Sequence, residues 1–392
     1  MAIDNKDKKV LNVPHLRFPE FSGEWKKYSF NDIAQYKKGP FGSALKKEIF
    51  VPKSADSVKI YEQQNAIKKD WELGRYYISR DYFINHMQQF IVEAGDIIVS
   101  CAGTIGEIYE LPPNAVSGVF NQALMRVRIN ATLIDKNIFI KVFSSMIDSF
   151  SKIYSNGSAI KNIPPFADLK KTNVFLPTQN EQYKISRLIS LLDERIATQN
   201  KIIEDLKKLK SAISERLFKS VKGSTVLLSD LCDIVKGKQI NGENLSDSGN
   251  YYVMNGGTEP SGYYDNYNVE ASTISISEGG NSCGYVQFNT SPFWSGGHCY
   301  SIQNIADKVD NMYLYHYLKS NEDAIMKLRI GSGLPNIQKK DLAMFKIIVP
   351  KIEWQIKIST FLSSLERKAE IEERIQNVMQ KQKLYLLQQM FI

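Results

Sequence analysis

Two stretches of the chain carry apolar side chains mostly at steps of three and four residues, the spacing that places them along one stripe of a helix, with Gln199 and Lys210 filling the missing places in the first stretch. The first stretch has them at Ile185, Ile189, Leu192, Ile196, Ile203, Leu206, Ile213 and Leu217. The second has them at Ile358, Leu362, Leu365, Ile371, Ile375, Val378, Leu386 and Met390. Such stripes are typical of a coiled-coil seam. We therefore predict two long helices, at residues 178–222 and 351–392, that pack against each other through these side chains.

The ends of the first helix have their own signals. Thr178 follows Pro177 and precedes Glu181 by three residues, which is a capping-box spacing, and Gly223 suits the end of the helix. A helix of this extent is roughly 60 Å long at 1.5 Å per residue. Such a helix has no second layer to cover its stripe, so pairing of the two helices is the simplest arrangement. The alternative is two unrelated helices, each within the core of a larger domain.

The other two segments, 1–177 and 223–350, are predicted to be β-rich domains. Alternating or β-branched runs occur at 88–103 (QQFIVEAGDIIVSCAG), 123–130 (ALMRVRIN) and 272–280 (STISISEGG). Gly, Asn and Pro bound these runs, as expected for strands joined by turns. The predicted fold class is α+β, with two β-rich domains separated by two long coiled-coil helices.

The chain also contains an internal repeat. The segment that begins at Gly157 aligns with the one that begins at Gly331, and beyond one gap Gln182 meets Gln355 at a constant offset of 173 residues. Residues 30–39 (FNDIAQYKKG) align more weakly with 228–237 (LSDLCDIVKG). The segment 61–80 has no evident counterpart. The pattern therefore predicts two copies of one unit, each with a variable domain followed by a constant helix. The two copies form a pseudo-twofold internal repeat.

Composition favours a polyanionic partner. The 392 residues include 50 Lys and Arg against 42 Asp and Glu, which gives a formal net charge of +8 and a pI near 9.0. No run of about 18 apolar residues occurs, and the opening MAIDNKDKKV has no apolar stretch of the kind that a secretory signal needs. We therefore expect a cytoplasmic protein.

No motif predicts chemistry carried out by this chain. The four cysteines form no CxxC pair, and the only suggestive cluster is Cys283 with His298 and Cys299. We expect buried free thiols and no metal site. A glycine-rich fingerprint for S-adenosylmethionine, a phosphate-binding GxxxxGK[ST] loop and a nuclease carboxylate set do not stand out. We therefore predict no catalytic residues.

Several motifs resemble those of a known family. They are VPHLRFPEFSGEWKKYSFNDIA (13–34), the helix starts LPTQNEQ (176–182) and VPKIEWQ (349–355), GSGLPNIQKKDL (331–342) and NGGTEPSGYYDNYN (255–268). Together they resemble the specificity (S) subunit of type I restriction-modification systems, the HsdS family, over essentially the whole chain. The segment 161–167 (KNIPPFA) departs from the family pattern, which is intact at Pro335.

The resemblance implies a non-catalytic subunit that binds double-stranded DNA. Two target-recognition domains, 1–177 and 223–350, would each read one half of a bipartite asymmetric site, held apart by an antiparallel pair of helices. Two modification subunits would methylate adenine N6, and two restriction subunits would add ATP-driven translocation and cleavage. S-adenosylmethionine, ATP and Mg²⁺ would belong to those partners, and this chain itself would hold no cofactor.

Candidate DNA contacts lie in polar or glycine-rich loops beside the predicted strands. Lysines there are candidates for phosphate contact: Lys37, Lys38, Lys46, Lys47, Lys161, Lys236, Lys238, Lys339 and Lys340. Polar side chains that could bond base edges are Gln63, Asn65, Thr104, Asn121, Gln122, Asn255, Ser277, Glu278, Asn281 and His298.

Two other functions fit parts of the sequence. A coiled-coil adaptor protein without DNA specificity would account for the helices, but it leaves the divergent β-rich domains and the positive charge unused. A stand-alone DNA methyltransferase would need cofactor and catalytic motifs of its own. Neither the bases read nor the spacer length can be deduced from the sequence.

Overall fold

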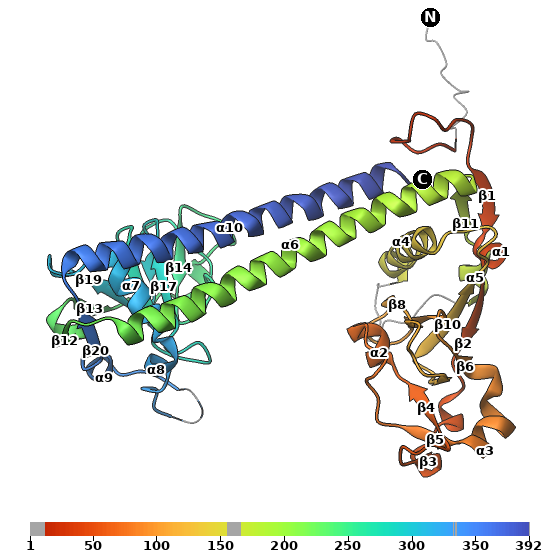
Figure 1. The fold of residues 1–392 in the computed structure, drawn as a ribbon, viewed down its shortest axis with the longest axis horizontal. Helices are drawn as coiled ribbons and strands as arrows, with labels where there is room; N and C mark the ends of the chain where they lie inside the picture. The colour runs from red at the N-terminus through yellow and green to blue at the C-terminus, as the bar shows by residue number, and fades with distance from the viewer. Residues whose placement is uncertain (1–11, 155–165, 332, 334, 392) are drawn as a thin grey trace, which may run out of the picture. The chain divides into compact units, whose positions relative to one another are not determined.

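The computed structural model describes residues 12–154, 166–331, 333 and 335–391 (Figure 1). The chain forms two compact units. Unit 1 comprises Met1–Ile196 and Met379–Ile392, and unit 2 comprises Ala197–Val378. Each long helix therefore begins in one unit and ends in the other, and each unit contains part of both.

Unit 1 is built on an antiparallel four-stranded sheet in the order β2-β10-β7-β8. Its strands are Ala34–Lys38, Leu124–Ile129, Ile97–Ser100 and Ile108–Glu110. Helix α4 (Lys136–Tyr154) supplies Phe139 and Phe143, which pack with Phe30 and Tyr36 in a buried aromatic cluster. This core forms because the apolar face of α4 and the inward side chains of the sheet bury each other.

A second sheet of unit 1 has five short strands in the order β3-β5-β4-β9-β6. They are Phe50–Val51, Tyr77–Ser79, Ser57–Tyr61, Gly118–Phe120 and Ile91–Val92. A further two-stranded sheet joins β1 (Lys26–Ser29) to β11 (Asn173–Leu176). Short helical turns complete the unit: α1 (Phe30–Ile33), α2 (Gln63–Lys68), α3 (Arg80–Tyr82), α5 (Phe166–Lys171), η1 (Gly42–Ala44), η2 (Lys47–Ile49), η3 (Phe83–Met87) and η4 (Gln88–Phe90).

Unit 2 is built on an antiparallel four-stranded sheet in the order β13-β19-β16-β17. Its strands are Asp233–Lys236, Cys299–Gln303, Thr273–Ser277 and Val286–Asn289. The smaller sheets are β15-β14-β18 (Tyr263–Tyr264, Tyr251–Met254, Trp294–Ser295) and β12-β20 (Ser224–Leu227, Lys346–Val349). The helices are α7 (Asn311–Ser320), α8 (Glu322–Met326), α9 (Lys339–Ala343), η5 (Leu228–Asp230) and η6 (Gly242–Asn244).

The two units share one topology, so the predicted α+β class with an internal repeat is confirmed. The order β2-β10-β7-β8 matches β13-β19-β16-β17, and β1-β11 matches β12-β20. In each unit a further strand, β4 or β14, pairs parallel to one neighbour and antiparallel to another. The segment 61–80, which showed no sequence counterpart, contains β5, and this strand takes the place that β15 has in unit 2.

A glutamine fixes each long helix to its unit in the same way. Gln182 accepts a hydrogen bond from the Asp135 N–H at 2.7 Å, and its amide donates to the carbonyls of Leu133 and Pro177. Gln355 accepts from the Asp310 N–H at 2.9 Å and donates to the carbonyls of Lys308 and Pro350. Both side chains are buried, so each amide satisfies three backbone groups that water does not reach. The repeat thus preserves an anchoring contact.

Helices α6 (Gln179–Ser220) and α10 (Ile352–Gln389) lie antiparallel within one chain. In unit 1 the start of α6 meets the end of α10, where Lys383 pairs with Asp193. In unit 2, Gln199 bonds Glu372 at 2.6 Å and, further along α6, Lys210 bonds the earlier residue Glu366 at 2.6 Å. The residue numbers on the two helices run in opposite directions, which settles the orientation and shows that the pair closes within the chain.

The predicted packing stripe is wrong over the middle of α10. Ile371, Ile375 and Val378 are 47%, 41% and 53% exposed. The side that meets α6 passes instead through Glu372 and Gln376, whose side chains bond Gln199 and Asn200. The six-residue step from Leu365 to Ile371 caused the error, because at about 100° per residue it rotates the stripe off the seam.

The remaining predicted packing residues face inward or are partly covered. Side chains of this group are buried at Ile185, Ile189, Ile203, Ile358 and Leu362 and half-buried at Leu192, Ile196, Leu206 and Leu365. Those in the first turns of each helix also contribute to the core of their own unit. Each seam therefore continues from a β-unit core into the helix pair.

A buried histidine makes the stability of unit 2 depend on pH. His316 on α7 is 2% exposed and its Nε2 lies 2.8 Å from the Ser363 hydroxyl of α10. Burial lowers the pKa of His316 to about 4. In this pH range the unfolded chain binds a proton at this histidine and the folded chain does not. The free energy of unfolding therefore falls as the pH decreases from about 6.5 to about 4.

We expect this loss to amount to about 3 kcal/mol at pH 4 relative to pH 7. Residue 316 cannot be protonated in the His316→Gln variant. Between pH 7 and pH 4, the free energy of unfolding of this variant should therefore fall by about 3 kcal/mol less than that of the wild type. Urea unfolding of both proteins at pH 7 and pH 4 measures the difference. Equal pH slopes in the two proteins would contradict the assignment.

Candidate nucleic-acid interface

In unit 2, loops from four strands converge at one end of the main sheet. Asn255, which follows β14, accepts a hydrogen bond from the His298 N–H at 3.0 Å. Ser277, at the end of β16, donates to the Gly256 carbonyl at 2.7 Å. The Lys238 N–H, after β13, bonds the Ser295 carbonyl at 2.8 Å. Segments far apart in the sequence are thereby held as one polar surface.

Glu278 lies at the centre of this surface. Its side chain is 9% exposed, yet it pairs with the Lys236 ammonium at 2.6 Å, and the Tyr300 hydroxyl lies 3.1 Å from the same oxygen, Oε1. The second oxygen, Oε2, is buried 3.7 Å from Nδ1 of His298 and accepts no hydrogen bond within the described part of the chain. Burial and the nearby carboxylate raise the pKa of Tyr300, so its hydroxyl remains a donor.

Glycines let the backbone approach closely where the first strand of each main sheet ends. A Cβ atom on Gly237 would lie 2.2 Å from the Gly296 carbonyl oxygen, and one on Gly39 would lie 1.9 Å from that of Asn121. The N–H of Gly237 bonds Cys299, and the N–H of Gly39 bonds Leu124. These two glycines are counterparts in the repeat, and each brings a lysine-bearing strand end against the neighbouring loop.

The corresponding loops of unit 1 have a different composition on the same frame. The Cys101 N–H bonds the Ala123 carbonyl as the Glu278 N–H bonds that of His298. A buried thiol thus stands where unit 2 has the buried carboxylate. Gln63 donates to the carbonyls of Ala102 and Thr104 and so ties α2 to this loop.

The structure gathers four of the ten predicted base-reading residues into one place. Asn255, Ser277, Glu278 and His298 meet in the unit 2 cluster, together with Lys236 from the predicted phosphate contacts. Asn281 is exposed in the turn that follows. In unit 1, Thr104, Asn121 and Gln122 lie on the loops beside β7 and β10, and Gln63 reaches the Thr104 loop from α2. Thr104 and Gln122 are exposed, and the Asn121 side chain accepts from the Ala123 N–H.

Two predicted base contacts are structural instead. Asn65 is 0% exposed; its amide donates to the carbonyls of Asp70 and Leu73 and its oxygen accepts from the Glu62 N–H. Ser277 is 4% exposed and its hydroxyl is engaged with Gly256. A base edge cannot reach either side chain. The three-residue spacing of Glu62 and Asn65, which forms a capping box at α2, was the missed signal.

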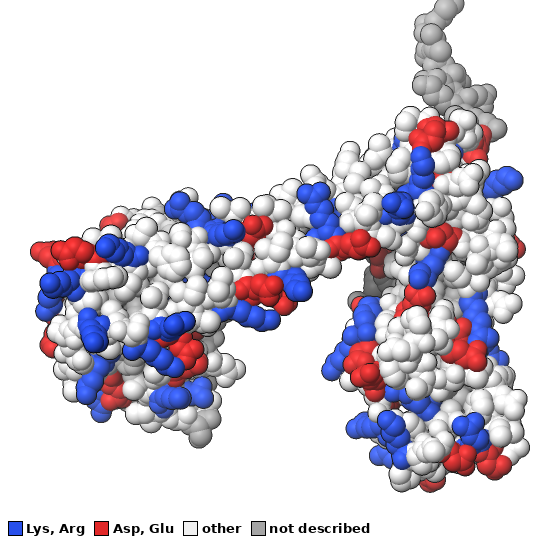
Figure 2. Space-filling model, viewed as in Figure 1, with Lys and Arg blue, Asp and Glu red and all other residues white. Residues whose placement is uncertain are grey.

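The predicted phosphate contacts are mostly solvent-exposed. Lys38, Lys46, Lys47, Lys238, Lys339 and Lys340 are exposed. Lys37 is half-buried, bonds Gln89 at 2.8 Å and lies over the Phe90 ring. Lys161 lies outside the described residues. Figure 2 shows blue and red side chains interspersed over both units on the visible face, so charge alone does not outline the interface. The sequence did not single out Tyr300, because it lies within a buried strand and not in one of the polar loops.

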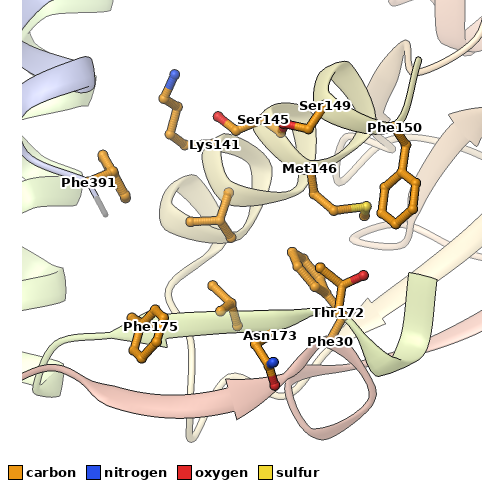
Figure 3. A pocket seen from close by; sticks show the side chains of 12 residues that line it. Phe30, Lys141, Ser145, Met146, Ser149, Phe150, Thr172, Asn173, Phe175 and Phe391 are labelled. Carbon is orange, nitrogen blue, oxygen red and sulfur yellow. The ribbon is translucent and has the colours of Figure 1, made fainter. Parts of the chain in front are cut away.

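A separate cavity of unit 1 lies between α4 and β11 (Figure 3). Its volume is about 330 Å³, and Phe30, Met146 and Phe150 give it an apolar lining. Lys141 is the titratable residue among the lining side chains, and burial lowers its pKa. Met146 points from α4 toward Phe30 and Thr172 in Figure 3. This cavity holds no acid–base pair and lies apart from the loop end of the sheet.

The cysteines have no site chemistry in this fold. All four, Cys101, Cys232, Cys283 and Cys299, are buried and unpaired. Burial raises the pKa of Cys101 and Cys232 to about 12 and that of Cys299 to about 11, so these thiols stay protonated. Among the described residues, no group of three or more His, Cys, Asp or Glu could hold a metal ion. In the same residues, no helix has the length and apolar character needed to cross a membrane.

The structural role of Asn65 gives a testable prediction. Asn65→Ala should lower the free energy of unfolding by about 2–3 kcal/mol, because it leaves buried backbone groups without partners. Gln122→Ala, an exposed matched change in the same unit, should leave it within about 0.5 kcal/mol. Urea unfolding of both variants tests this. A stable Asn65→Ala protein would contradict the structural role assigned to this side chain.

Comparison with known proteins gives one consistent family. A model of the type I restriction modification DNA specificity domain matches residues 22–208 and again residues 222–381. A putative type I specificity subunit of Mycoplasma genitalium is 34% identical over 122 residues, which is 31% of each chain. The chain thus matches about a third of the length of that curated relative, and a Mycoplasma pneumoniae relative matches over 38% of its length.

Other matches extend over the whole chain. The MjaVIII type I restriction enzyme specificity subunit of Methanocaldococcus jannaschii is 22% identical, with 96% of this chain and 94% of the relative covered. A crystal structure of a type I restriction-modification S subunit from Mycoplasma genitalium superimposes with a TM-score of 0.60 at 18% identity and covers 97% of this chain and 99% of that one. At this identity the superposition shows a common fold.

Proposed function

Because the chain belongs to the family of type I restriction modification DNA specificity domains, we propose that it selects the DNA sequence for a type I restriction-modification complex. Each unit reads one half of a bipartite, asymmetric duplex site. The chain performs no catalysis itself. The adaptor alternative, in which the helices serve assembly without sequence recognition, is an outcome of the experiment below.

The observation that carries this proposal is that the two units share one arrangement of strands but differ in the loop residues at the end of the main sheet. The units share strand order, the glutamine anchor and the paired glycines. They differ at the loop end of the main sheet, where Cys101 occupies the place of Glu278. A repeated scaffold with different donors and acceptors suits a site whose two halves differ in sequence.

The exposed side chains at these loop ends have the chemistry that duplex DNA requires. Lysines such as Lys38, Lys238 and Lys339 can neutralise phosphates, which fixes register without reading sequence. Amide and imidazole side chains such as those of Gln122 and His298 can bond base edges in the major groove. The helix pair sets the length of the unread spacer between the half-sites.

The helix pair also offers two equivalent docking surfaces. Ile202 and Ile375 are counterparts at the 173-residue offset, and each is 41% exposed. Ile371 and Val378 extend the stripe on α10, and Leu209 extends it on α6. We assign these two stripes to two modification subunits, one on each helix, because exposed apolar stripes of this kind mark interaction sites.

The chemistry resides in those partners. The modification subunits supply S-adenosylmethionine and methylate adenine N6 in each half-site, with the target base turned out of the duplex into their pocket. Two restriction subunits supply the ATP- and Mg²⁺-dependent translocation and cleavage. The role of this chain is to place both activities at one sequence.

Mapping of N6-methyladenine tests the function directly. The chain is co-expressed with its cognate modification subunit, and genomic methylation is read by single-molecule sequencing beside a strain that lacks this chain. We expect a split, asymmetric motif that disappears in the control strain. Methylation that persists unchanged without the chain, despite a well-formed complex, would favour the adaptor function.

The docking stripes predict a change in stoichiometry. Ile202→Glu or Ile375→Glu alone should remove one of two modification subunits, and the double variant should remove both, because a charge in an apolar contact lacks a partner. Native mass spectrometry of the co-purified complex counts the subunits. Met344→Glu, an exposed apolar position away from both helices, is the control. Full assembly by the double variant would disprove this assignment.

A further inference from the structure

We propose that Glu278 is a positioning residue that holds Lys236 and His298 as a pair of donors for a guanine in the half-site read by unit 2. This inference rests on the proposed function and deepens it, since it names the base and the side chains. The carboxylate itself is too deeply placed to touch DNA: its side chain is 9% exposed, whereas those of Lys236 and His298 are 54% and 63% exposed.

The fold does not require an acid at this position. In unit 1 the same backbone position, with the same hydrogen bond to the neighbouring strand, holds Cys101, which is 3% exposed. A buried carboxylate with one oxygen outside any hydrogen bond costs free energy that a thiol does not. Glu278 therefore has a role other than packing, and the groups that it contacts indicate the role.

The contacts of Glu278 orient two exposed side chains. Lys236 gives Oε1 one N–H at 2.6 Å, which leaves the ammonium two further donors toward solvent. Nδ1 of His298 lies 3.7 Å from Oε2, beyond hydrogen-bond distance, so this contact positions the ring without a hydrogen bond. Nε2 is left for a partner outside the protein, and an imidazole N–H at that position can donate to a base edge.

The surroundings leave room for a base edge. His298 lies beside the backbone of Gly256 and Gly279, and a Cβ on Gly256 would approach the His298 Cβ to 3.0 Å. Gly280, next to this pair, has a φ of +77° and no heavy atom within 4 Å of its Cβ direction. Two donors beside open space match the O6 and N7 acceptors of guanine in the major groove, whereas adenine and cytosine present an amino donor there.

Unit 1 provides an internal comparison. Lys38 is the counterpart of Lys236 at the end of the equivalent strand, and it is exposed. Its neighbour is the Cys101 thiol, which carries no charge to hold an ammonium. A carboxylate therefore anchors Lys236 in unit 2, whereas its counterpart Lys38 in unit 1 lacks this anchor. This difference gives the two half-sites different recognition chemistry.

The test uses the assembled methyltransferase, with the chain bound to its cognate modification subunit. Its substrates are duplexes in which each position of both half-sites is varied in turn. Glu278→Cys reproduces the residue that unit 1 tolerates, and Lys236→Met removes the ammonium but keeps the aliphatic stem. Each should reduce the preference for guanine at one position of one half-site by about 5- to 150-fold and leave the other half-site unchanged.

Three further proteins separate positioning from simple loss of structure. Lys236→Arg should retain the guanine preference, because a guanidinium also bonds O6 and N7. The double variant Glu278→Cys/Lys236→Met should lose no more of the guanine preference than either single variant, since the two residues act as a unit. Lys346→Met, an exposed lysine on β20, should behave as the wild type.

Other results would overturn the inference. A uniform fall in methylation of all sequences by Lys236→Met would identify a phosphate contact in place of a guanine contact. An unchanged preference in Glu278→Cys would remove the positioning role. If the wild-type complex recognises no split site at all, the proposed function fails instead, so the two failures are distinguishable.

Discussion

The antiparallel contact between α6 and α10 constrains the rest of the molecule, because it joins two helices that lie far apart in the sequence. Gln199 and Glu372 bond each other, and the two residues are also counterparts at the 173-residue offset of the repeat. The Lys210–Glu366 pair lies further along the same seam. An apolar seam alone would tolerate slippage, whereas paired polar groups within it have one register that satisfies them. The two copies of the repeat therefore meet at counterpart residues in this seam.

Gln182 and Gln355 attach the two long helices to the β-rich units. Each glutamine bonds the proline between the preceding strand and its helix, and it also bonds the turn that leads into α4 or α7. Buried hydrogen bonds thus fix the direction in which each long helix leaves its unit. The loops at the far end of the main sheet take no part in this anchoring. They are free to differ, as the exchange of Cys101 for Glu278 shows, while the frame stays the same. A chain organised in this way can change what it reads without altering how it assembles.

Periodicity and self-comparison predicted much of this arrangement. The stripe on α6, the α+β class and the repeat could be deduced because they depend on spacing, which is local and survives divergence. The stripe on α10 failed at Ile371, where polar residues occupy the seam and apolar ones face outward. The candidate site was reached only in part: residue type suggested Glu278 and His298, but Asn65 and Ser277 have the same polar character and serve the backbone. Tyr300 could be found only once the strands were paired.

Missing-nucleoside interference on one recognised duplex tests the central claim most directly. DNA that lacks one base per molecule is bound by the assembled complex, and bound and free fractions are sequenced. The account predicts two separate clusters of bases whose loss prevents binding, different in sequence, with a stretch between them whose bases can be removed without effect. A single continuous cluster, or interference that is equal at all positions, would contradict the claim that the two units read two half-sites.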